Sequence, residues 1–272
     1  MSSTHNHSEQ PGDDLPVEYN PDGSRVLRHE GGGELEAPVF LDEAQMERIE
    51  AHVKAHLGES PNVLHEILSF GIHVDVLVVP PTEESPFLAI ATMGMSAVPM
   101  TFDEGSFDPD GPQPTPFAEL AMVLPPDWPI DVLGKEDATD EEKEEAHWPI
   151  GLIKDLARVP INYDTALGAG HTIPNGDPAE PYAPGCPFTG VILLPGDFIS
   201  EGFGCLEGSE EGAGEGDAAH PPIDWFVVAP LYSEEMDHKL QHGIESLMDR
   251  LEAAGIDPLE MADPRRPNSC AE

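Results

Sequence analysis

Lysine and arginine are scarce in this sequence of 272 residues. Together they number 12, against 53 aspartates and glutamates, and the formal net charge at pH 7 is -41. Proteins bind nucleic acid and anionic membranes through clustered cationic side chains, which displace counterions from phosphate groups. The densest cationic pair is Arg265–Arg266, near the C-terminal end. We therefore expect neither nucleic acid nor a membrane as a partner.

Cysteine and long apolar runs are also rare. The three cysteines, Cys186, Cys205 and Cys270, are widely spaced and form no C-x-x-C motif, which predicts neither a disulfide framework nor a zinc knuckle. Residues 1–20 lack the basic start and apolar core of a signal peptide, and no stretch approaches the roughly 18 apolar residues of a membrane helix. These absences predict a soluble chain in a reducing cytoplasm.

The negative charge is partly clustered, most densely at 140–145 and 207–211. Over a folded surface of roughly 11,500 Å², the excess charges lie about 17 Å apart, which exceeds the Debye length of about 8 Å at physiological salt. The clustered charges lie closer together and need more salt for screening. An acidic, lysine-poor chain of this kind suits a halophilic host with a salt-rich cytosol, and it equally suits a basic protein partner.

Composition divides the chain into a tail and one domain. Residues 1–38 are rich in Gly, Pro, Asp, Glu and His and show no apolar period, which predicts a disordered, acidic tail. Residues 39–268 carry the apolar segments of a single domain. Within this domain, residues 201–220 are acidic and glycine-rich, which predicts a mobile insert loop between two strands.

Apolar residues of the domain recur with two different periods. A period of three and four predicts helices at 43–57 after the N-cap Asp42, at 149–158 with Pro149 in the first turn, and at 234–254. Alternating or continuous apolar segments predict strands at 72–79, 87–93, 117–124, 191–194 and 223–231. Pro160 is expected to end the second helix. The strands should share one sheet, with the third helix flat upon it.

The densest group of polar residues lies in the loop after the second helix. Tyr163 and Asp164 precede this loop, and His171, Asn175 and Asp177 lie within it. A loop of this length could bring these side chains into one polar pocket, with His171 as a base. The alternative, which we favour, is turn chemistry around Asn175 with a structural His171.

Two of the tryptophans lie in apolar surroundings. Trp225 falls within a predicted strand, which indicates a core position. Trp148 precedes Pro149 at the expected entry of the second helix, where it should pack as a staple against Leu152 or Ile153. Trp148 completes a set of candidate binding residues with Tyr163, Asp164, His171, Asn175 and Asp177.

Histidines offer two arrangements that resemble metal sites. His73 and Asp75 project from one strand face downstream of His65, but such neighbours more often form a hydrogen-bonded or ionic pair. His238 and His242 share one side of the third helix, where the intervening lysine opposes a cation. We therefore expect no metal.

Motifs for catalysis and for nucleotide binding are missing. The sequence contains no G-x-S-x-G, no P-loop and no complete G-x-G-x-x-G. Cys186 has no base nearby in the sequence, and a buried structural thiol is its expected role. We therefore expect no catalytic residue and no cofactor.

Several segments, in their order along the chain, resemble those of the suppressor of fused domain family, and bacterial members of it in particular. The similarity runs from about Leu41 to Asn268. It rests on HVDV at 73–76, TMGMS at 92–96, LPPDWP at 124–129, WPI at 148–150, GHTIPNG at 170–176 and PLYSEEM at 230–236.

This resemblance implies an α+β protein, an α/β sandwich in which a mixed, mostly antiparallel sheet is covered by helices, without catalytic activity. The animal relatives bind a short extended segment of a transcription factor with the help of a second, C-terminal domain. Their ligand-binding aspartate before the matching histidine corresponds to Gly170 here, and their ligand-binding tyrosine after the matching Arg158 corresponds to Val159. The resemblance therefore does not transfer the animal ligand to this chain.

Bacterial members resemble immunity proteins of contact-dependent toxin systems, which implies that this chain binds and neutralises a toxin domain. A basic toxin, such as a nuclease, would complement the acidic surface. The main expectation is therefore a non-catalytic protein-binding domain. One alternative is a hydrolase or metal-dependent enzyme that uses His171 with Asp164 or Asp177. Another alternative is a scaffold that binds several proteins weakly.

Overall fold

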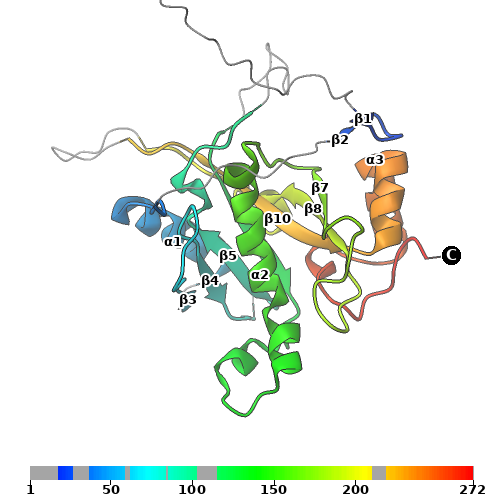
Figure 1. Cartoon of the computed structure of the whole chain (residues 1–272), viewed down its shortest axis with the longest axis horizontal. Helices are drawn as coiled ribbons and strands as arrows, with labels where there is room; N and C mark the ends of the chain where they lie inside the picture. The colour runs from blue at the N-terminus through cyan, green and yellow to red at the C-terminus, as the bar shows by residue number, and fades with distance from the viewer. Residues whose placement is uncertain are drawn as a thin grey trace, which may run out of the picture.

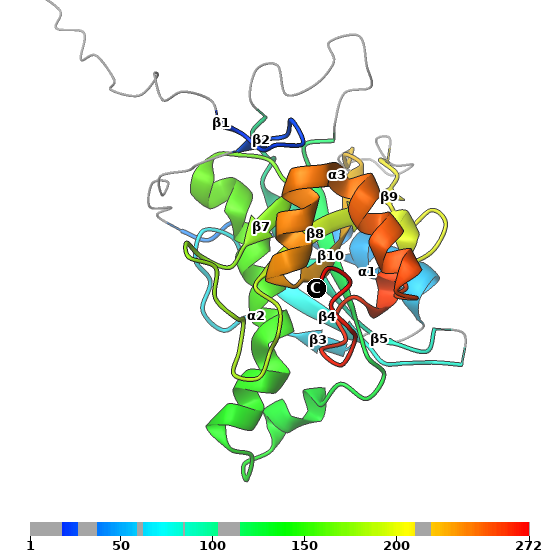
Figure 2. The same cartoon turned by 90° about the vertical axis from the view of Figure 1, so that its right-hand side faces the viewer.

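Helices cover both faces of a large β-sheet (Figures 1 and 2). The structure is a computed structural model, and it describes residues 18–26, 37–58, 62–83, 85–102, 115–209 and 219–271. Within these residues the sheet has eight strands. They are β3 (Asn62–Leu64), β4 (Asp75–Val79), β5 (Leu88–Met93), β6 (Ala118–Leu124), β7 (Thr172–Pro174), β8 (Gly190–Pro195), β9 (Cys205–Leu206) and β10 (Ile223–Leu231).

The strand order is β3-β4-β5-β6-β10-β8-β7, and β9 pairs with β10. β6 and β10 are parallel, whereas the other neighbouring pairs of this sheet are antiparallel. This topology confirms the predicted α+β class with a mixed, mostly antiparallel sheet. It leaves β3 and β7 as the first and last strands of the order.

Both faces of the sheet are buried by helices. Along β10, the side chains of Trp225 and Val227 point to one face, and that of Val228 points to the other. On the face of Val228 lies α2 (Asp140–Tyr163). The opposite face carries α1 (Glu43–Leu57) over β4 and β5 and α3 (Ser233–Ala253) over β8 and β10. Because both faces are covered, β4, β5 and β6 are buried at every position.

α1 has the bounds that the sequence predicts. The side chain of Asp42 accepts a hydrogen bond from the backbone N–H of Gln45 at 2.8 Å, and Gly58 follows the last helical residue. The apolar stripe of α1 packs against Phe203 and Trp225, and both rings are fully buried. Trp225 is therefore a core residue, as predicted.

α2 is longer than predicted, because it begins well before Pro149. Thr139 and Glu142 form a capping box in which each side chain accepts a hydrogen bond from the other residue's backbone N–H, at 3.2 and 2.8 Å. Pro149 and Pro160 both lie inside the helix and are buried. Each proline removes one helical hydrogen bond. Burial of the apolar face of α2 on the sheet offsets that loss, so Pro160 does not end the helix.

α3 begins at Ser233, where the backbone N–H of Tyr232 donates to the Glu235 carboxylate at 3.1 Å. Gly243 interrupts the helix with a φ of 86° and a ψ of 169°. Because only glycine adopts such a conformation readily, this residue lets α3 bend while both halves stay on the sheet.

Two segments that the sequence assigns to a tail and a loop contain structure. Residues 18–26 form a hairpin of β1 (Glu18–Tyr19) and β2 (Arg25–Val26), in which the N–H of Asp22 donates to the carbonyl of Leu240 on α3. Residues 1–17 and 27–36 of the predicted tail lie outside the described residues. In the predicted insert, buried Phe203 and strand β9 anchor the chain, whereas residues 210–218 lie outside the described part.

A buried carboxylate organises the turn after β5. Glu119 is fully buried, and it accepts hydrogen bonds from the backbone N–H groups of Gly94 and Ser96, both at 3.0 Å. It also accepts them from the hydroxyls of Thr92 and Ser96, both at 2.6 Å. Gly94 has a φ of 144°, and a Cβ there would lie 2.0 Å from the carbonyl oxygen of His73. The turn is therefore closely packed against the backbone before β4.

The C-terminal segment is held by a buried ion pair. The side chains of Arg266 and Glu235 are 4% and 0% exposed, and two hydrogen bonds of 2.7 Å join them. The guanidinium also lies over the rings of Phe188 and Tyr232, at 5.0 and 4.8 Å from their centroids. The N–H and hydroxyl of Ser269 donate to the same carboxylate at 2.9 Å. These contacts tie residues 261–269 to the start of α3.

Candidate functional site

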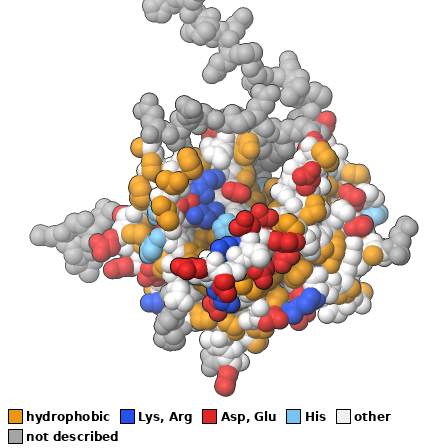
Figure 3. All heavy atoms as spheres, turned by 60° about the horizontal axis from the view of Figure 1, so that its bottom comes forward, with side chains coloured by type: hydrophobic (Ala, Val, Ile, Leu, Met, Phe, Trp, Pro, Cys, Tyr) orange, Lys and Arg blue, Asp and Glu red, His pale blue; other side chains and the backbone are white. Residues whose placement is uncertain are grey.

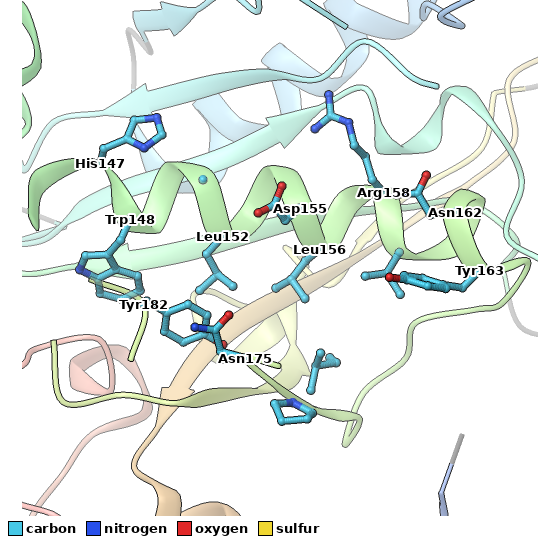
Figure 4. A pocket seen from close by; sticks show the side chains of 14 residues that line it. His147, Trp148, Leu152, Asp155, Leu156, Arg158, Asn162, Tyr163, Asn175 and Tyr182 are labelled. Atoms are coloured by element: carbon cyan, nitrogen blue, oxygen red, sulfur yellow. The ribbon is translucent and has the colours of Figure 1, made fainter. Parts of the chain in front are cut away.

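A groove of about 570 Å³ runs along the exposed side of α2, between this helix and the segment that contains β7 (Figure 4). On the helix it is lined by His147, Trp148, Gly151, Leu152, Asp155, Leu156, Arg158, Val159, Asn162 and Tyr163. The facing segment contributes Ile173, Pro174, Asn175 and Tyr182. The groove therefore joins the second helix to the polar loop that the sequence singles out.

One side of the groove is apolar (Figure 4). Trp148, Leu152 and Leu156 are spaced by four residues, so they share one face of α2 and point toward the β7 segment. The ring of Trp148 stacks on Tyr182 with centroids 5.5 Å apart, and it meets Trp128 edge to face at 5.8 Å. Burial raises the pKa of the Tyr182 phenol, which therefore stays neutral. Trp148, Leu152 and Leu156 are themselves buried, so this side of the groove is a rigid apolar wall.

The other side of the groove is polar. His147, Asp155 and Arg158 leave α2 away from the apolar row (Figure 4). Asp155 is exposed, but the protein around its carboxylate removes enough water to raise its pKa, against the opposing effects of Arg158 and Lys154. Within the described residues Asp155 forms no ion pair. It is therefore a negative charge available to a cationic group in the groove.

Arg158 is engaged with the loop before β4. Its Nη2 atom lies 2.7 and 2.8 Å from the two carboxylate oxygens of Glu66, and Nζ of Lys154 lies 2.6 Å from one of them. The Nε of Arg158 donates to the carbonyl of Phe70 at 3.2 Å. Burial raises the pKa of Glu66, but hydrogen bonds from Lys154, the Val74 N–H and Arg158 outweigh it and lower the pKa overall. These bonds fix loop 65–71 to α2.

β7 is the last strand of the sheet and forms part of the groove wall. Its register with β8 pairs Ile173 with Val191, and the flanking residues His171 and Asn175 also bond to the β8 side. In an antiparallel pair the backbone groups of alternate residues point away from the partner strand. The N–H and C=O of Thr172 therefore face the outer edge of β7, where no described strand pairs with them.

One face of the molecule carries many acidic side chains. Acidic side chains are spread over the face shown in Figure 3, with apolar side chains between them and basic side chains in only a few places. This distribution agrees with the formal net charge of -41. A cationic partner would therefore be attracted to the surface over distances set by the salt concentration.

The groove brings together three of the six residues that the sequence singles out. Trp148 lies inside α2, so it is not the staple at a helix entry that the sequence predicts. Tyr163 is the last residue of α2 and is 38% exposed. Asn175 lines the opposite wall, where its Nδ2 donates to the carbonyl of Glu180 at 2.7 Å.

The remaining three candidates do not line the groove. Asp164 follows α2 with a φ of 51° and accepts a hydrogen bond from the Thr101 hydroxyl at 2.7 Å. His171 and Asp177 are exposed. Among the described residues no hydrogen bond joins His171 to Asp164 or Asp177, so the geometry does not support the alternative of a hydrolase in this loop.

The sequence analysis did not single out most of the residues that line the groove, Asp155, Leu156 and Tyr182 among them. Asp155 and Leu156 lie in the predicted helix, and the spacing of four from Trp148 through Leu152 to Leu156 is the signal that could have placed the apolar row. Tyr182 contacts Trp148 from a distant part of the chain, and no local pattern indicates that contact.

The histidine arrangements form pairs. As predicted, His73 and Asp75 are hydrogen-bonded, with Nε2 and Oδ1 2.9 Å apart, and His65 Nδ1 lies 2.9 Å from the other oxygen. The rings of His238 and His242 lie 4.5 Å apart. In the ranges that the structure describes, no three His, Cys, Asp or Glu side chains are placed to hold a metal ion. No helix in those ranges has the length and apolar character to span a membrane.

All three cysteines are free thiols. Cys186 is buried beside the groove wall, and burial raises its pKa. A raised pKa keeps the thiol protonated and weakly nucleophilic. This agrees with the structural role that the sequence predicts for it.

The sequence of this chain matches one protein-family model. The model of the suppressor of fused protein (SUFU) family matches residues 71–267, which span the groove and all strands from β4 onward. A search of the curated proteins finds no match.

Solved structures share the fold. A SUFU (suppressor of fused protein) homolog from Neisseria gonorrhoeae FA 1090 has a TM-score of 0.54 and 14% identity, over 85% of this chain and 100% of that one. The Sufu–Fu complex gives 0.51 and 12%, over 83% and 92%. Drosophila Suppressor of Fused gives 0.50 and 12%, over 90% and 54%, so this chain spans about half of that protein. At these identities the likeness concerns the fold alone.

Proposed function

Because this chain belongs to the suppressor of fused family, which is known from Sufu as a family of protein-interaction domains, we propose that it binds another polypeptide in the groove between α2 and β7. The bound segment is extended, and its apolar side chains lie along the wall that Trp148, Leu152 and Leu156 form. The binding requires no chemistry in the groove.

The observation that carries this proposal is the position of an open strand edge beside an apolar wall. An extended peptide that adds to a sheet edge gains main-chain hydrogen bonds, and pockets for its alternate side chains give specificity. The outward N–H and C=O of Thr172 supply such bonds at β7. Ile173 and Pro174 of the same strand line the groove, so one segment could use both features.

The charge of the site favours a basic partner. Asp155 lies among the groove residues without an ion pair in the described part of the chain, and the whole chain is strongly acidic. Complementary charge accelerates encounter and excludes acidic competitors. In line with the resemblance to bacterial immunity proteins, we propose that the partner is a basic toxin domain, which this protein neutralises in the cytoplasm.

We do not expect the ligand of the animal relatives to be the partner of this chain. By the resemblance, Gly170 and Val159 correspond to the aspartate and the tyrosine that contact that ligand. Val159 lines the groove, and Gly170 precedes β7 with a φ of 83°. By the resemblance, an apolar side chain in the groove and a glycine before β7 stand where the animal proteins have polar contacts, so we expect a partner of another sequence.

Two groove variants with matched controls test the proposal. Thr172→Pro removes the outward N–H, and a proline is tolerated on an edge strand. Its control, Thr172→Val, keeps the N–H and removes only a hydroxyl that has no hydrogen-bond partner among the described residues. Asp155→Arg reverses the groove charge. Its control, Glu252→Arg, makes the same charge change at an exposed position on α3, across the sheet.

The measurement is co-purification from the native host at host salt, followed by titration of the partner that is recovered in stoichiometric amount. Thr172→Pro and Asp155→Arg should each weaken binding at least about 10-fold, while the two controls bind as the wild type does. Equal binding by all four variants would place the interface elsewhere. Protection of cells that express the partner tests the toxin assignment separately. Binding without protection would support the docking site but contradict the assignment of the partner as a toxin.

A further inference from the structure

Three serine hydroxyls contact a histidine ring in the part of the chain that the structure describes. The pairs are Ser69 with His73 at 2.7 Å, Ser200 with His56 at 2.8 Å and Ser246 with His238 at 2.9 Å. Among these described pairs, only His73 has a carboxylate at its other ring nitrogen, with Asp75 Oδ1 at 2.9 Å from Nε2. A hydroxyl, an imidazole and a carboxylate in line form the constellation of serine hydrolases.

Asp75 fixes the protonation pattern of this line. An ionised carboxylate only accepts hydrogen bonds, so Nε2 of His73 carries the proton and donates it to Asp75. The other nitrogen, Nδ1, is then bare and accepts the hydroxyl of Ser69. This is the arrangement in which an imidazole acts as a general base toward a serine. The two ring nitrogens have exchanged the roles that they hold in the serine proteases, but the proton path is the same.

The carboxylate and the imidazole are firmly held. Asp75 is 5% exposed, and it also accepts a hydrogen bond from the backbone N–H of Glu66 at 2.8 Å. The ring of His73 stacks on Phe40, with centroids 4.8 Å apart. The ion pairs of Glu66 with α2 fix the loop that carries Ser69. A constellation that is fixed before substrate arrives is what catalysis requires.

The loop also offers a surface for a substrate. Ile67, Leu68 and Phe70 flank Ser69, and they are 94%, 74% and 74% exposed. The backbone N–H groups of Ser69, Phe70 and Gly71 donate no hydrogen bond within the described residues, so they are free to meet a developing oxyanion. We propose that Ser69, His73 and Asp75 form a hydrolytic site for carboxylic esters with an apolar acyl group.

The reaction has two balanced halves. Oγ of Ser69 adds to the ester carbonyl carbon while its proton passes to Nδ1 of His73. The C–O bond to the leaving group then breaks, and that oxygen takes the proton from His73 and departs as the alcohol. In the second half, water attacks the acyl-serine, gives a proton to His73, and Ser69 recovers a proton as the carboxylic acid leaves. Asp75 stays ionised throughout and stabilises the imidazolium.

This site is separate from the groove. Neither Ser69 nor His73 lines the groove, and the link between the two places is the contact of Arg158 with Glu66 and Phe70. The proposed hydrolytic activity is therefore independent of the proposed partner binding.

The test uses the purified full chain and two probes. p-Nitrophenyl butyrate reports turnover, and a fluorophosphonate reports a reactive serine, because the serine oxygen bonds to phosphorus as fluoride leaves. The variant Ser69→Ala removes the nucleophile. Ser200→Ala and Ser246→Ala are matched controls, since each removes a serine whose histidine has no carboxylate at its other ring nitrogen in the described part of the chain.

We expect Ser69→Ala to lower the turnover rate at least about 100-fold, with an unchanged melting temperature, while the controls stay within about 2-fold of the wild type. Mass spectrometry should locate the fluorophosphonate on the peptide that contains Ser69. Equal turnover by the wild type and Ser69→Ala would overturn the proposal. So would fluorophosphonate labelling that is absent or confined to other serines.

Discussion

Replacement of Arg266 by methionine should destabilise the fold much more than the same replacement of its neighbour Arg265. Arg266 is buried and forms two hydrogen bonds of 2.7 Å with Glu235. Arg265 lies on the surface, where it pairs with Asp127 and Asp263 and is 61% exposed. The two adjacent arginines therefore separate the effect of burial from the effect of ion pairing.

The magnitude follows from what the replacement leaves behind. Methionine fills most of the volume of Arg266, but the carboxylate of Glu235 stays fully buried without its cation. Removal of one partner from a buried ion pair costs about 3–5 kcal/mol. Glu235 keeps the hydrogen bonds from Ser269 and Tyr232, so we expect about 3 kcal/mol. For a domain of this size that corresponds to a melting temperature lower by roughly 6–12 °C.

Urea unfolding and thermal melting of the two single variants and of the double variant R266M/E235M provide the measurement. The double variant leaves no unpaired charge at this buried site, so most of the lost stability should return. The loss should also reach the groove, because Arg266 lies over Phe188, whose ring is 6.3 Å from that of Trp148. Equal losses for R265M and R266M, or no recovery in the double variant, would refute this reasoning.

Three further results are expected. Gly94→Ala should destabilise the fold by more than about 2 kcal/mol in urea titrations, because its Cβ would lie 2.0 Å from the carbonyl oxygen of His73; wild-type stability would contradict the described turn. The Glu66 carboxylate has a pKa below its ordinary value of 4.5, so it stabilises the fold above pH 4.5 and loses this effect as the pH falls further. Glu66→Gln should therefore flatten the acid side of the plot of stability against pH. An unchanged slope would be inconsistent with the bonds of Glu66 to Lys154 and Arg158. The urea midpoint should rise between about 0.1 M and about 2 M KCl, since the Debye length shortens several-fold; an unchanged midpoint would argue against a halophilic host.

The fold was predictable where one local pattern dominates. Asp42 and Gly58 mark both ends of α1, and the apolar segments give β5, β6, β8 and β10 nearly to the residue. α2 shows where local rules fail. Pro149 and Pro160 are typical of helix ends, yet the packing of the apolar face on the sheet carries the helix through both residues. That packing depends on residues that are distant in the sequence.

The candidate site was predictable only in part, for the same reason. Asn175 of the polar loop lines the groove, whereas His171 and Asp177 do not, and the groove wall depends on the stacking of Trp148 and Tyr182 across separate segments. The pair of His73 and Asp75 was predictable because the two residues share a strand face. Ser69 was missed, because its contact with His73 depends on how loop 65–71 is bent and held by Glu66, which no periodicity indicates.

α2 connects the two proposed sites without merging them. Its groove side carries Asp155, whereas Lys154 and Arg158 hold the loop of Ser69 through Glu66. If the sites act separately, Asp155→Arg should weaken partner binding at least about 10-fold and leave ester turnover intact, whereas Ser69→Ala should abolish turnover and leave binding intact. If both variants lose both properties, α2 transmits changes between the sites, and the groove and the loop must be treated as one functional unit.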